Sequence, residues 1–273
     1  MKLKKHEVAL IIFLAVVIVA AGIVIFVTLR EYSEGDRTYH KFQGYVFLPE
    51  ETPLVKPDSG ENTGVSGTPV PEEEGTENDF VDTEPPVVNF AGLQALNSDI
   101  LGWIYSPGTP VNYPIVQGDT NEEYLYHMVD GSYNRCGSIF LDCGNDREFQ
   151  DANSVIHGHN MNNGSMFGEL KKYAEQEYYD THSEIWLLTP DKTYSIEIFA
   201  AFVTDVDNEV WKLTFSSEEE FTTWKSDMAK KSYFKSKVSP QAGEKVVTLS
   251  TCSYEFDDAH FVVIGVLRQK EKN

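Results

Sequence analysis

The sequence predicts a mainly β fold with helices (α+β), in which short strands close into a barrel and helices are inserted between them. Two observations predict it. Short apolar segments, several of them alternating or rich in β-branched residues, recur between turn residues from about residue 102 onward. Only two segments in that part of the chain, 165–182 and 217–234, have the spacing of an amphipathic helix. Many short strands with few helices are typical of a closed barrel.

The first residues decide the expected compartment. Residues 1–7 carry Lys2, Lys4 and Lys5, and residues 8–28 carry no charge. A membrane-spanning helix needs about 20 apolar residues, whereas the apolar part of a cleaved signal peptide has roughly 7–15. We therefore expect a cytoplasmic tail at 1–7 and an uncleaved transmembrane signal anchor at 8–28, with the rest of the chain outside the cell membrane. A buried core helix is the alternative for this segment.

The segment after the anchor, residues 29–86, is expected to form an extracellular stalk. Residues 29–47 have no clear hydrophobic period, and residues 48–86 are rich in Pro, Gly, Glu and Asp. A chain of the second composition cannot bury enough apolar surface to offset the entropy lost on ordering. We expect the stalk to be largely disordered from residue 48, and the folded domain to occupy residues 87–273.

The expected elements of that domain alternate between short strands and a few helices. In chain order they are a helix at 90–97, strands near 102–105, 111–117, 136–142 and 153–160, a helical segment at 165–182, a hairpin formed by 184–190 and 193–206, a helix within 217–234, and strands at 245–252 and 260–267. The last helix should begin at Ser216 or Ser217 as N-cap, because acids follow in its first turn and lysines lie in its last.

The charge and the motifs exclude several function classes. The net charge of −21 and the pI of about 4.6 argue against a nucleic-acid partner. The sequence contains no GxGxxG, P-loop or CxxCH motif, so no nucleotide or haem cofactor is expected. No metal site is expected either, because the adjacent acids at 255–258 read as solvated charge. An extended strand between Cys136 and Cys143 would hold them ~20 Å apart, too far for a disulfide, so both are expected as small buried residues.

Cys252 ends a predicted strand as an unpaired thiol, and a nucleophilic thiol needs a basic partner. His159 is a candidate partner, because it lies in a polar turn where the strand "NSVIH" ends. His157 and His260 are the other histidines near predicted strand ends. From spacing alone, a surface position for His159 remains open.

Taken together, "GHN" followed by "GSMFGELKKY", "TLSTC" and "YEFDDA" behind a signal anchor resemble the class B sortases, which are membrane-anchored cysteine transpeptidases of Gram-positive bacteria. The resemblance covers residues 90–267 and includes "DILGWI", "NYPIVQ" and "GSIFLD". It implies an eight-stranded sortase barrel with an N-terminal helical extension and an inserted helix before the cysteine strand.

The resemblance also implies a reaction and its residues. Cys252 would attack the carbonyl after Thr in a C-terminal sorting signal of the NPxTx type and form an acyl-thioester. His159 would act first as general acid and then as base for an incoming amine, either of a peptidoglycan precursor (lipid II) or of a pilin lysine. The implied signal groove is lined by four further residues, with Thr251 near the oxyanion: Asn112, His157, Ser250 and Thr251.

The sequence departs from the family at His260, where class B sortases carry the arginine that stabilises the oxyanion. Three interpretations are open. His260 donates the hydrogen bond itself; Arg135 or Arg147 supplies the cation from a loop; or the protein is a weak or inactive homologue that binds signals at the membrane. Arg268 lies eight residues further along, about 26 Å in an extended strand. An ordinary cysteine peptidase is a further alternative, although a papain-type "CGSCW" is absent.

Overall fold

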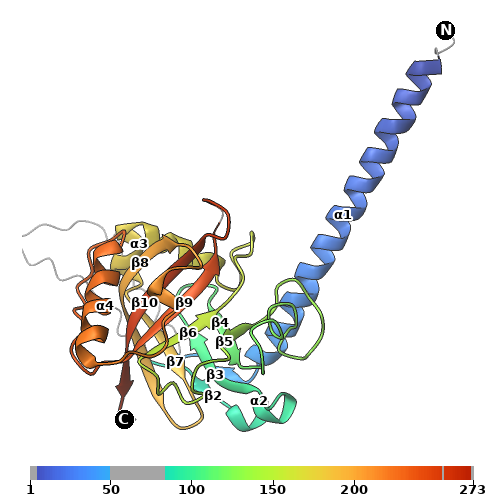
Figure 1. Ribbon diagram of the computed structural model, residues 1–273. Coiled ribbons are helices and arrows are strands. Elements are labelled where there is room, and N and C mark those ends of the chain that lie inside the picture. Colours follow the sequence, from blue (N-terminus) through green and yellow to red (C-terminus); the bar gives the residue numbers. More distant parts are fainter. Residues whose placement is uncertain (1–4, 50–83, 254, 272–273) are drawn as a thin grey trace, which may run out of the picture.

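The computed structural model describes residues 5–49, 84–253 and 255–271, which form a β barrel with a long helix attached to it (Figure 1). Eight strands close the barrel in the order β10-β8-β7-β3-β4-β5-β6-β9, as predicted. In chain order they are β3 (Ile100–Tyr105), β4 (Asn112–Val116), β5 (Ile139–Leu141), β6 (Asn153–His157), β7 (Glu184–Leu188), β8 (Thr193–Thr204), β9 (Val246–Cys252) and β10 (His260–Lys270).

Helices lie before the barrel and in the connections between its strands. They are α1 (Lys5–Gln43), α2 (Phe90–Leu96), the 3-10 helix η1 (Gly168–Ala174), α3 (Gln176–Thr181), the 3-10 helix η2 (Glu209–Trp211) and α4 (Glu218–Lys231). The inserted helix α4 precedes the cysteine strand, and the hydroxyl of Ser217 accepts a hydrogen bond from the backbone N–H of Glu220 at 3.2 Å. Ser217 is therefore the N-cap.

The pairing of the last strands brings the ends of three strands to one rim of the barrel. Strands β6 and β9 are parallel, with His157 opposite Ser250, so both end at the same rim. Strand β10 is antiparallel to β9 and starts where β9 ends, which sets His260 opposite Cys252. The topology therefore gathers the end of β6, the end of β9 and the start of β10.

Strands β8, β9 and β10 are covered on both faces. Inside the barrel, Trp103, Leu249 and Val263 belong to one buried cluster. On the outer face, Val262 packs in a second cluster, in which α4 supplies the buried side chains Phe221, Trp224 and Met228. Because both faces are buried, these strands read as continuous β-branched runs rather than as alternating sequences.

The segment 165–182 forms two short helices, so the expectation of one helical segment is corrected. The 3-10 helix η1 ends at Ala174, Glu175 has extended dihedral angles (φ −104°, ψ 130°), and α3 then begins. The buried side chains Phe167, Leu170 and Tyr173 are spaced by three residues. That spacing matches the three residues per turn of a 3-10 helix better than the 3.6 of an α-helix.

The helix α1 continues to Gln43, so residues 29–47, expected as stalk, are helix and strand instead. Gly35, Tyr39 and Phe42 are buried against the barrel, at the i, i+4, i+7 spacing of one helix face. The hydroxyl of Tyr39 donates to the backbone carbonyl of Gly137. The folded domain thus begins well before residue 87. The sequence does not show this buried helix face clearly, because glycine occupies one of its three positions.

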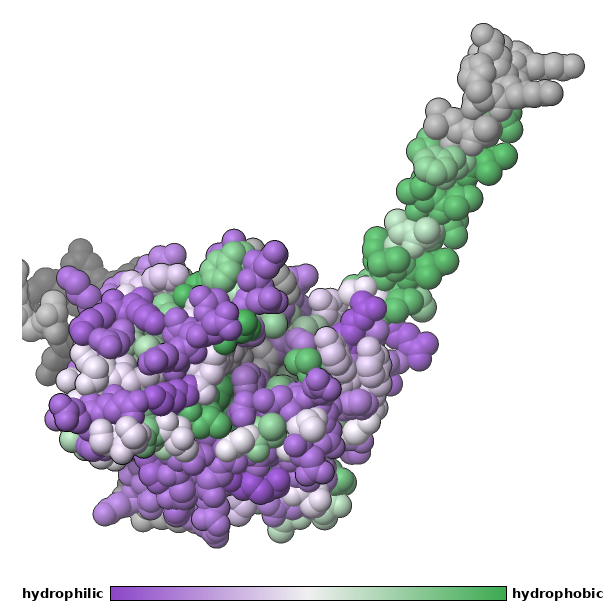
Figure 2. Space-filling view, in the orientation of Figure 1, coloured by the Kyte–Doolittle hydropathy of each residue, from purple (hydrophilic) through white to green (hydrophobic). Residues whose placement is uncertain are grey.

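The short strand β1 (Val46–Phe47) then pairs antiparallel with β2 (Val87–Val88). The expected disordered part of the stalk, 48–86, lies mostly outside the described residues. The first half of α1 projects away from the barrel and is covered with apolar side chains, whereas the visible face of the barrel is largely hydrophilic (Figures 1 and 2). This helix is long and apolar enough to cross a membrane.

Candidate active site

Cys252 and His260 are direct cross-strand neighbours at the rim of the barrel. Side chains of such opposite residues point to the same face, with Cβ atoms about 4.5–5.5 Å apart. A tight connection joins the two strands, in which the Ser253 N–H donates to the Ala259 carbonyl at 2.7 Å. Cys252 is exposed, and Nδ1 of His260 lies 3.1 Å from the carbonyl oxygen of Asp258. The pairing therefore places the side chains of His260 and Cys252 on the same face of the two strands.

His159 lies two residues beyond the end of β6, in a segment fastened to β9 on both sides. The Gly158 N–H donates to the Ser250 carbonyl at 3.0 Å, and the Asn160 side-chain amide donates to the Cys252 carbonyl at 2.9 Å. These two hydrogen bonds flank His159. The second hydrogen bond joins the His159 loop directly to the backbone of Cys252.

The hydrogen bonding of His159 fixes its tautomer. Nε2 lies 2.6 Å from the carbonyl oxygen of Leu125. A carbonyl oxygen only accepts, so Nε2 carries a proton and donates it. Within the described part of the chain Nδ1 has no hydrogen-bond partner, which leaves that nitrogen free to exchange a proton. The ring also lies 5.9 Å from the ring of Tyr126, centroid to centroid.

The thiol of Cys252 is protonated at neutral pH in this arrangement. Burial around the sulfur raises the pKa of Cys252, and a backbone hydrogen bond only partly offsets it. Among the described residues, no hydrogen bond joins Sγ to His159 or to His260. The resting thiol must therefore lose its proton when substrate arrives or in a minor protonation state.

Buried side-chain atoms without hydrogen-bond partners concentrate around this rim. The described residues contain eight such atoms, and three of them, Ser154 Oγ, Glu184 Oε1 and Ser195 Oγ, lie elsewhere in the barrel. The five at this rim are Asn160 Oδ1, Thr204 Oγ1, Ser250 Oγ, Thr251 Oγ1 and Ser253 Oγ. An unpaired buried polar group costs about 1–3 kcal/mol, so native proteins keep few of them. Side chains alternate along β9, so the Ser250 hydroxyl shares the face of Cys252 whereas that of Thr251 is on the barrel interior face.

A row of rings covers the outer face next to the thiol. The His157 ring stacks between Phe140 at 5.1 Å and Trp211 at 6.2 Å, centroid to centroid. The edge of Trp211 in turn meets His260 at 5.3 Å. Trp211 was not among the predicted site residues. The signal for it is a single tryptophan in the connection between β8 and α4, and only the tertiary fold reveals what it contacts.

His157 also contacts an acid. Its Nε2 lies 3.2 Å from Oδ2 of Asp142. Burial by itself would raise the pKa of Asp142, but hydrogen bonds from His157, Gly144 N–H and Asn121 together lower it below its ordinary value. Asp142 is therefore ionised at neutral pH and orients the His157 ring. This arrangement fits a wall residue of a groove.

The remaining predicted residues are held elsewhere. Oδ1 of Asn112 accepts from Nε1 of Trp103 at 2.8 Å, and its carbonyl accepts from Gln43 of α1 at 2.9 Å. Arg147 donates to the Gln117 carbonyl at 3.3 Å. Arg135 forms an ion pair with Glu31 of α1, at 3.6 Å between Nε and Oε2. None of these contacts involves Cys252 or His260.

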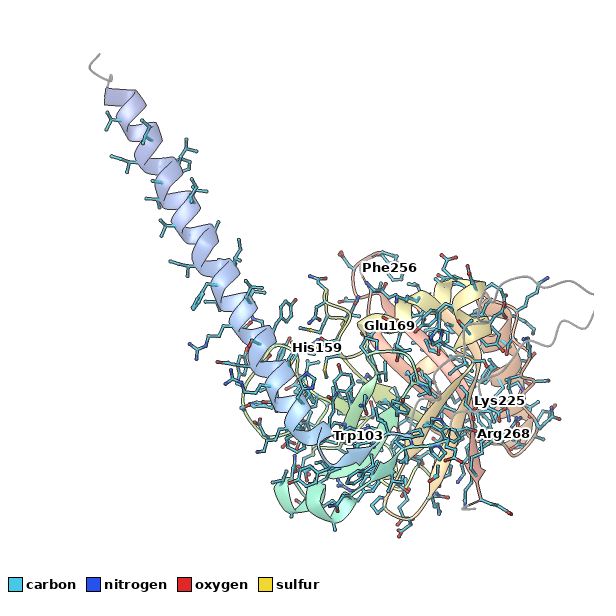
Figure 3. All side chains as sticks on the ribbon, turned by 180° about the vertical axis from the view of Figure 1, so that it is seen from behind. Trp103, His159, Glu169, Lys225, Phe256 and Arg268 are labelled. Atoms are coloured by element: carbon cyan, nitrogen blue, oxygen red, sulfur yellow. The ribbon has the colours of Figure 1, made fainter. Side chains whose placement is uncertain are left out.

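Arg268 is far from the site, as its place in the sequence suggests. It pairs with Glu197 and Glu244, and Figure 3 shows it on the opposite side of the barrel from His159. All three cysteines are free, and Cys136 is buried as expected. The expectation of a buried Cys143 was wrong, because β5 ends at Leu141 and leaves Cys143 exposed in the following turn.

Comparisons with known proteins agree with this geometry. A model of the sortase domain matches residues 104–268. Sortase B of Listeria monocytogenes is 34% identical over 180 residues, which are 65% of this chain and 73% of that protein. A Staphylococcus aureus sortase B-substrate complex matches with a TM-score of 0.64 at 29% identity, over 67% of this chain and 85% of that one. Sortase B from B. anthracis in complex with AAEK1 gives a TM-score of 0.69 at 29% identity, over 89% of this chain and 100% of that one.

The matched region includes the strands that carry Cys252 and the segment that carries His159. It also includes the start of β10, where His260 lies. The fold, the strand order and the similarity in sequence all lead to the same assignment. This chain belongs to the sortase family, in class B.

Proposed function

We propose that this protein is a cysteine transpeptidase of the cell envelope, which cleaves an NPxTx-type sorting signal after Thr and transfers the surface protein to an amine. The amine would belong to a peptidoglycan precursor or to a pilin lysine. The apolar first half of α1 would hold the enzyme in the membrane, with the N-terminal lysines inside.

The observation that carries this proposal is the hydrogen bond between the Asn160 side chain and the Cys252 carbonyl. It ties the loop of a histidine with a free Nδ1 to the residue that carries an exposed thiol. The proposed nucleophile and acid–base catalyst thus follow from the ends of two parallel strands, and this side-chain to backbone hydrogen bond joins their segments.

The proposed reaction exchanges one amide for another through a thioester. Sγ of Cys252 bonds to the carbonyl carbon of Thr, its proton passes to Nδ1 of His159, and the imidazolium returns a proton to the departing amine as the C–N bond breaks. An incoming amine then attacks the thioester carbon and loses a proton to His159. The C–S bond breaks and the thiol is restored.

We propose the outer face at the end of β9 as the binding surface for the sorting signal. Cys252 and Ser250 point to this face, His157 stands beside Ser250, and Trp211 covers the row. An extended peptide would meet this surface at the exposed Cys252, whereas the unpaired Ser250 hydroxyl is buried beneath the row of rings. Asn112 would act at a distance, by fixing β4 to Trp103 and to α1.

We assign the oxyanion contact to His260. It is the Cα partner of Cys252 and is the cross-strand side chain on the same face. Arg147 and Arg268 are engaged with Gln117 and with two glutamates. The contact of His260 with Trp211 fixes the ring on a second side. Because Nδ1 already donates to the Asp258 carbonyl, Nε2 is the donor to the oxyanion and carries its proton in the imidazolium form. A donor of this kind stabilises the charge that develops in the transition state.

A second candidate function is a signal-binding module with little or no turnover. The observation that favours it is the thiol, which is protonated and has no hydrogen bond to either histidine in the described residues. Such a protein would hold sorting signals at the membrane without forming a thioester.

The test uses the full chain in detergent micelles, because Tyr39 and Phe42 of α1 belong to the core and a shorter fragment would lose them. The protein is incubated with NPxTx-type peptides, with and without an amine, and intact-protein mass spectrometry follows adducts. A transpeptidase gives an acyl adduct that the amine removes as a new amide. A binding module gives peptide affinity and no adduct.

The matched control replaces the second exposed thiol, which lies outside the site. Cys252→Ala should abolish the adduct, and Cys143→Ala should retain it. An adduct that persists in Cys252→Ala would rule out every mechanism based on this cysteine.

A further inference from the structure

A cavity of about 230 Å³ lies between α1 and the loop of His159, and neither Trp211 nor His157 lines it. Figure 3 shows His159 beside α1, where the helix meets the barrel. Three wall segments contribute, namely α1, the connection before β5 and the loop after β6. The lining residues are Thr28, Glu31, Tyr32, Asn134, Arg135, His159, Asn160, Met161 and Asn162.

The cavity walls are fixed to one another. The side-chain amide of Asn134 donates to the backbone carbonyl of Glu31 at 3.0 Å, which fastens the loop to the helix. The Asn160 amide is fastened to the Cys252 carbonyl. The cavity therefore adjoins both the acid–base histidine and the backbone of the nucleophile, without being part of the face on which Ser250 lies.

Two opposite charges lie in this cavity. Glu31 is the less exposed of the pair, with 25% of its side chain exposed, and Arg135 is 69% exposed. Their closest approach of 3.6 Å is longer than the roughly 2.7–2.9 Å of a charge-assisted hydrogen bond. A ligand that carries an ammonium next to a carboxylate can satisfy both, with its ammonium at Glu31 and its carboxylate at Arg135.

We propose that this cavity is the acceptor site and that it selects an amine flanked by a carboxylate, as at the amino-acid end of a diamino dicarboxylic acid. The inference rests on the proposed transpeptidase function. The sorting signal occupies the outer face of β9, and the acceptor enters from the α1 side of His159.

The free Nδ1 of His159 can accept a proton from the acceptor amine. The ammonium held at Glu31 first loses one proton to solvent, and the neutral amine then attacks the thioester carbon of acylated Cys252. A C–N bond forms, the nitrogen passes its second proton to Nδ1 of His159, the C–S bond breaks, and the sulfur takes that proton from the imidazolium. Glu31 holds the amine before it reacts, so it is a binding residue and not a proton acceptor in the step.

The position relative to the membrane supports this acceptor. Thr28 ends the uncharged run of residues 8–28, and Glu31 lies three residues further along α1. At 1.5 Å per residue that separation is only about 4.5 Å. If residues 8–28 span the bilayer, the cavity opens at the outer membrane surface, where an acceptor linked to a lipid would be presented.

The experiment compares two acceptor tripeptides that differ by one carboxylate: one carries meso-diaminopimelate and the other carries lysine at the same position. Binding is measured by titration calorimetry with full-chain Cys252→Ala in detergent, which needs no turnover. The diaminopimelate peptide should bind at least about tenfold more tightly, as expected for a hydrogen bond to a charged group. Arg135→Gln should bring it to the level of the lysine peptide, and Glu31→Gln should weaken both.

The matched control is Arg37→Gln, which removes a positive charge from an exposed position of the same helix outside the cavity. It should retain the tenfold preference. Equal affinity of the two peptides, or a preference that survives in Arg135→Gln, would overturn the acceptor site. A preference that is present while no thioester ever forms on the wild-type chain would instead contradict the transpeptidase proposal and leave the cavity as an amino-acid site.

Discussion

The two ends of the β9–β10 pair differ in how their polar groups are satisfied. At the far end, Arg268 is paired with Glu197 and Glu244, and Lys270 lies 3.1 Å from Glu184. At the rim that holds Cys252, buried hydroxyls and an amide oxygen have no partner among the described residues. The far end also holds two buried atoms without a hydrogen bond in the described part of the chain, Ser195 Oγ and Glu184 Oε1, but five lie at the rim. One end of the strand pair is therefore dominated by ion pairs and the other by unpaired polar groups.

The middle of the pair keeps the two ends separate. The residues between them are apolar and buried on both faces, inside the barrel and beneath α4. A close-packed core of this kind fixes the spacing of the ends and leaves little room for either to adjust. The difference between the ends thus predicts that substitutions at the rim alter the reaction rate, whereas substitutions at the far end alter the free energy of unfolding.

The largest effect in this comparison, after loss of Cys252 itself, should come from His159→Ala. It removes the nitrogen that accepts and returns protons, and general acid–base catalysis contributes about 10²–10⁴-fold. We expect kcat/KM for the amine-dependent reaction to fall by that range with little change in melting temperature. His182→Gln, in a histidine that stacks on Tyr178 next to α3, is the control and should keep full activity. Activity that survives in His159→Ala would remove this histidine from the mechanism.

The next effect concerns His260, to which we assign the oxyanion contact. His260→Ala should lower kcat/KM by about 10²–10³-fold, the cost of one oxyanion donor. His260→Arg should retain or increase activity, because a guanidinium offers more donors at the same place. The measurement is the rate of acyl-enzyme formation for all three proteins. Equal rates for the wild type and His260→Ala would show that this imidazole contributes nothing to the oxyanion.

The rim could be predicted from the sequence to the extent that it depends on local pattern. The β-branched run before Cys252 and the polar turn after His157 both mark strand ends, and strand ends gather at barrel rims. The N-cap Ser217 is also a local feature. These signals are confined to a few neighbouring residues, so they are visible without the fold.

The α1 side of the site could not be predicted in this way. The contact between Glu31 and Asn134 joins residues 103 apart in sequence, and Trp211 reaches His260 from a connection of its own. The exposure of Cys143 depends on where β5 ends, which pairing with β4 and β6 decides. Such features follow from the closed fold, and no local pattern encodes them.

A smaller effect is expected in the reactivity of the thiols with pH. Burial raises the pKa of Cys252, so its thiolate fraction at pH 7 is below that of a free cysteine, whose pKa is about 8.5. Alkylation by iodoacetamide should be slower than for a free thiol and should continue to rise above about pH 8.5. Burial, reinforced by Asp36, raises the pKa of Cys136 to about 12, so it should stay unmodified while folded. Peptide mapping separates the sites, and rapid alkylation of Cys252 at pH 7 would indicate a thiolate–imidazolium pair instead.

The smallest expected effect on activity comes from Arg268→Ala, which tests the other end of the comparison. Loss of its pairs with Glu197 and Glu244 should lower the free energy of unfolding by about 1 kcal/mol, since these groups are partly exposed to solvent. Thermal denaturation would show a shift of a few degrees, while the rate of acyl-enzyme formation stays at the wild-type value. His260→Ala should give the reverse pattern, an unchanged melting temperature and a slow reaction. If Arg268→Ala slowed the reaction as His260→Ala does, the two ends would be coupled through the apolar middle, and the rim could no longer be treated as an independent site.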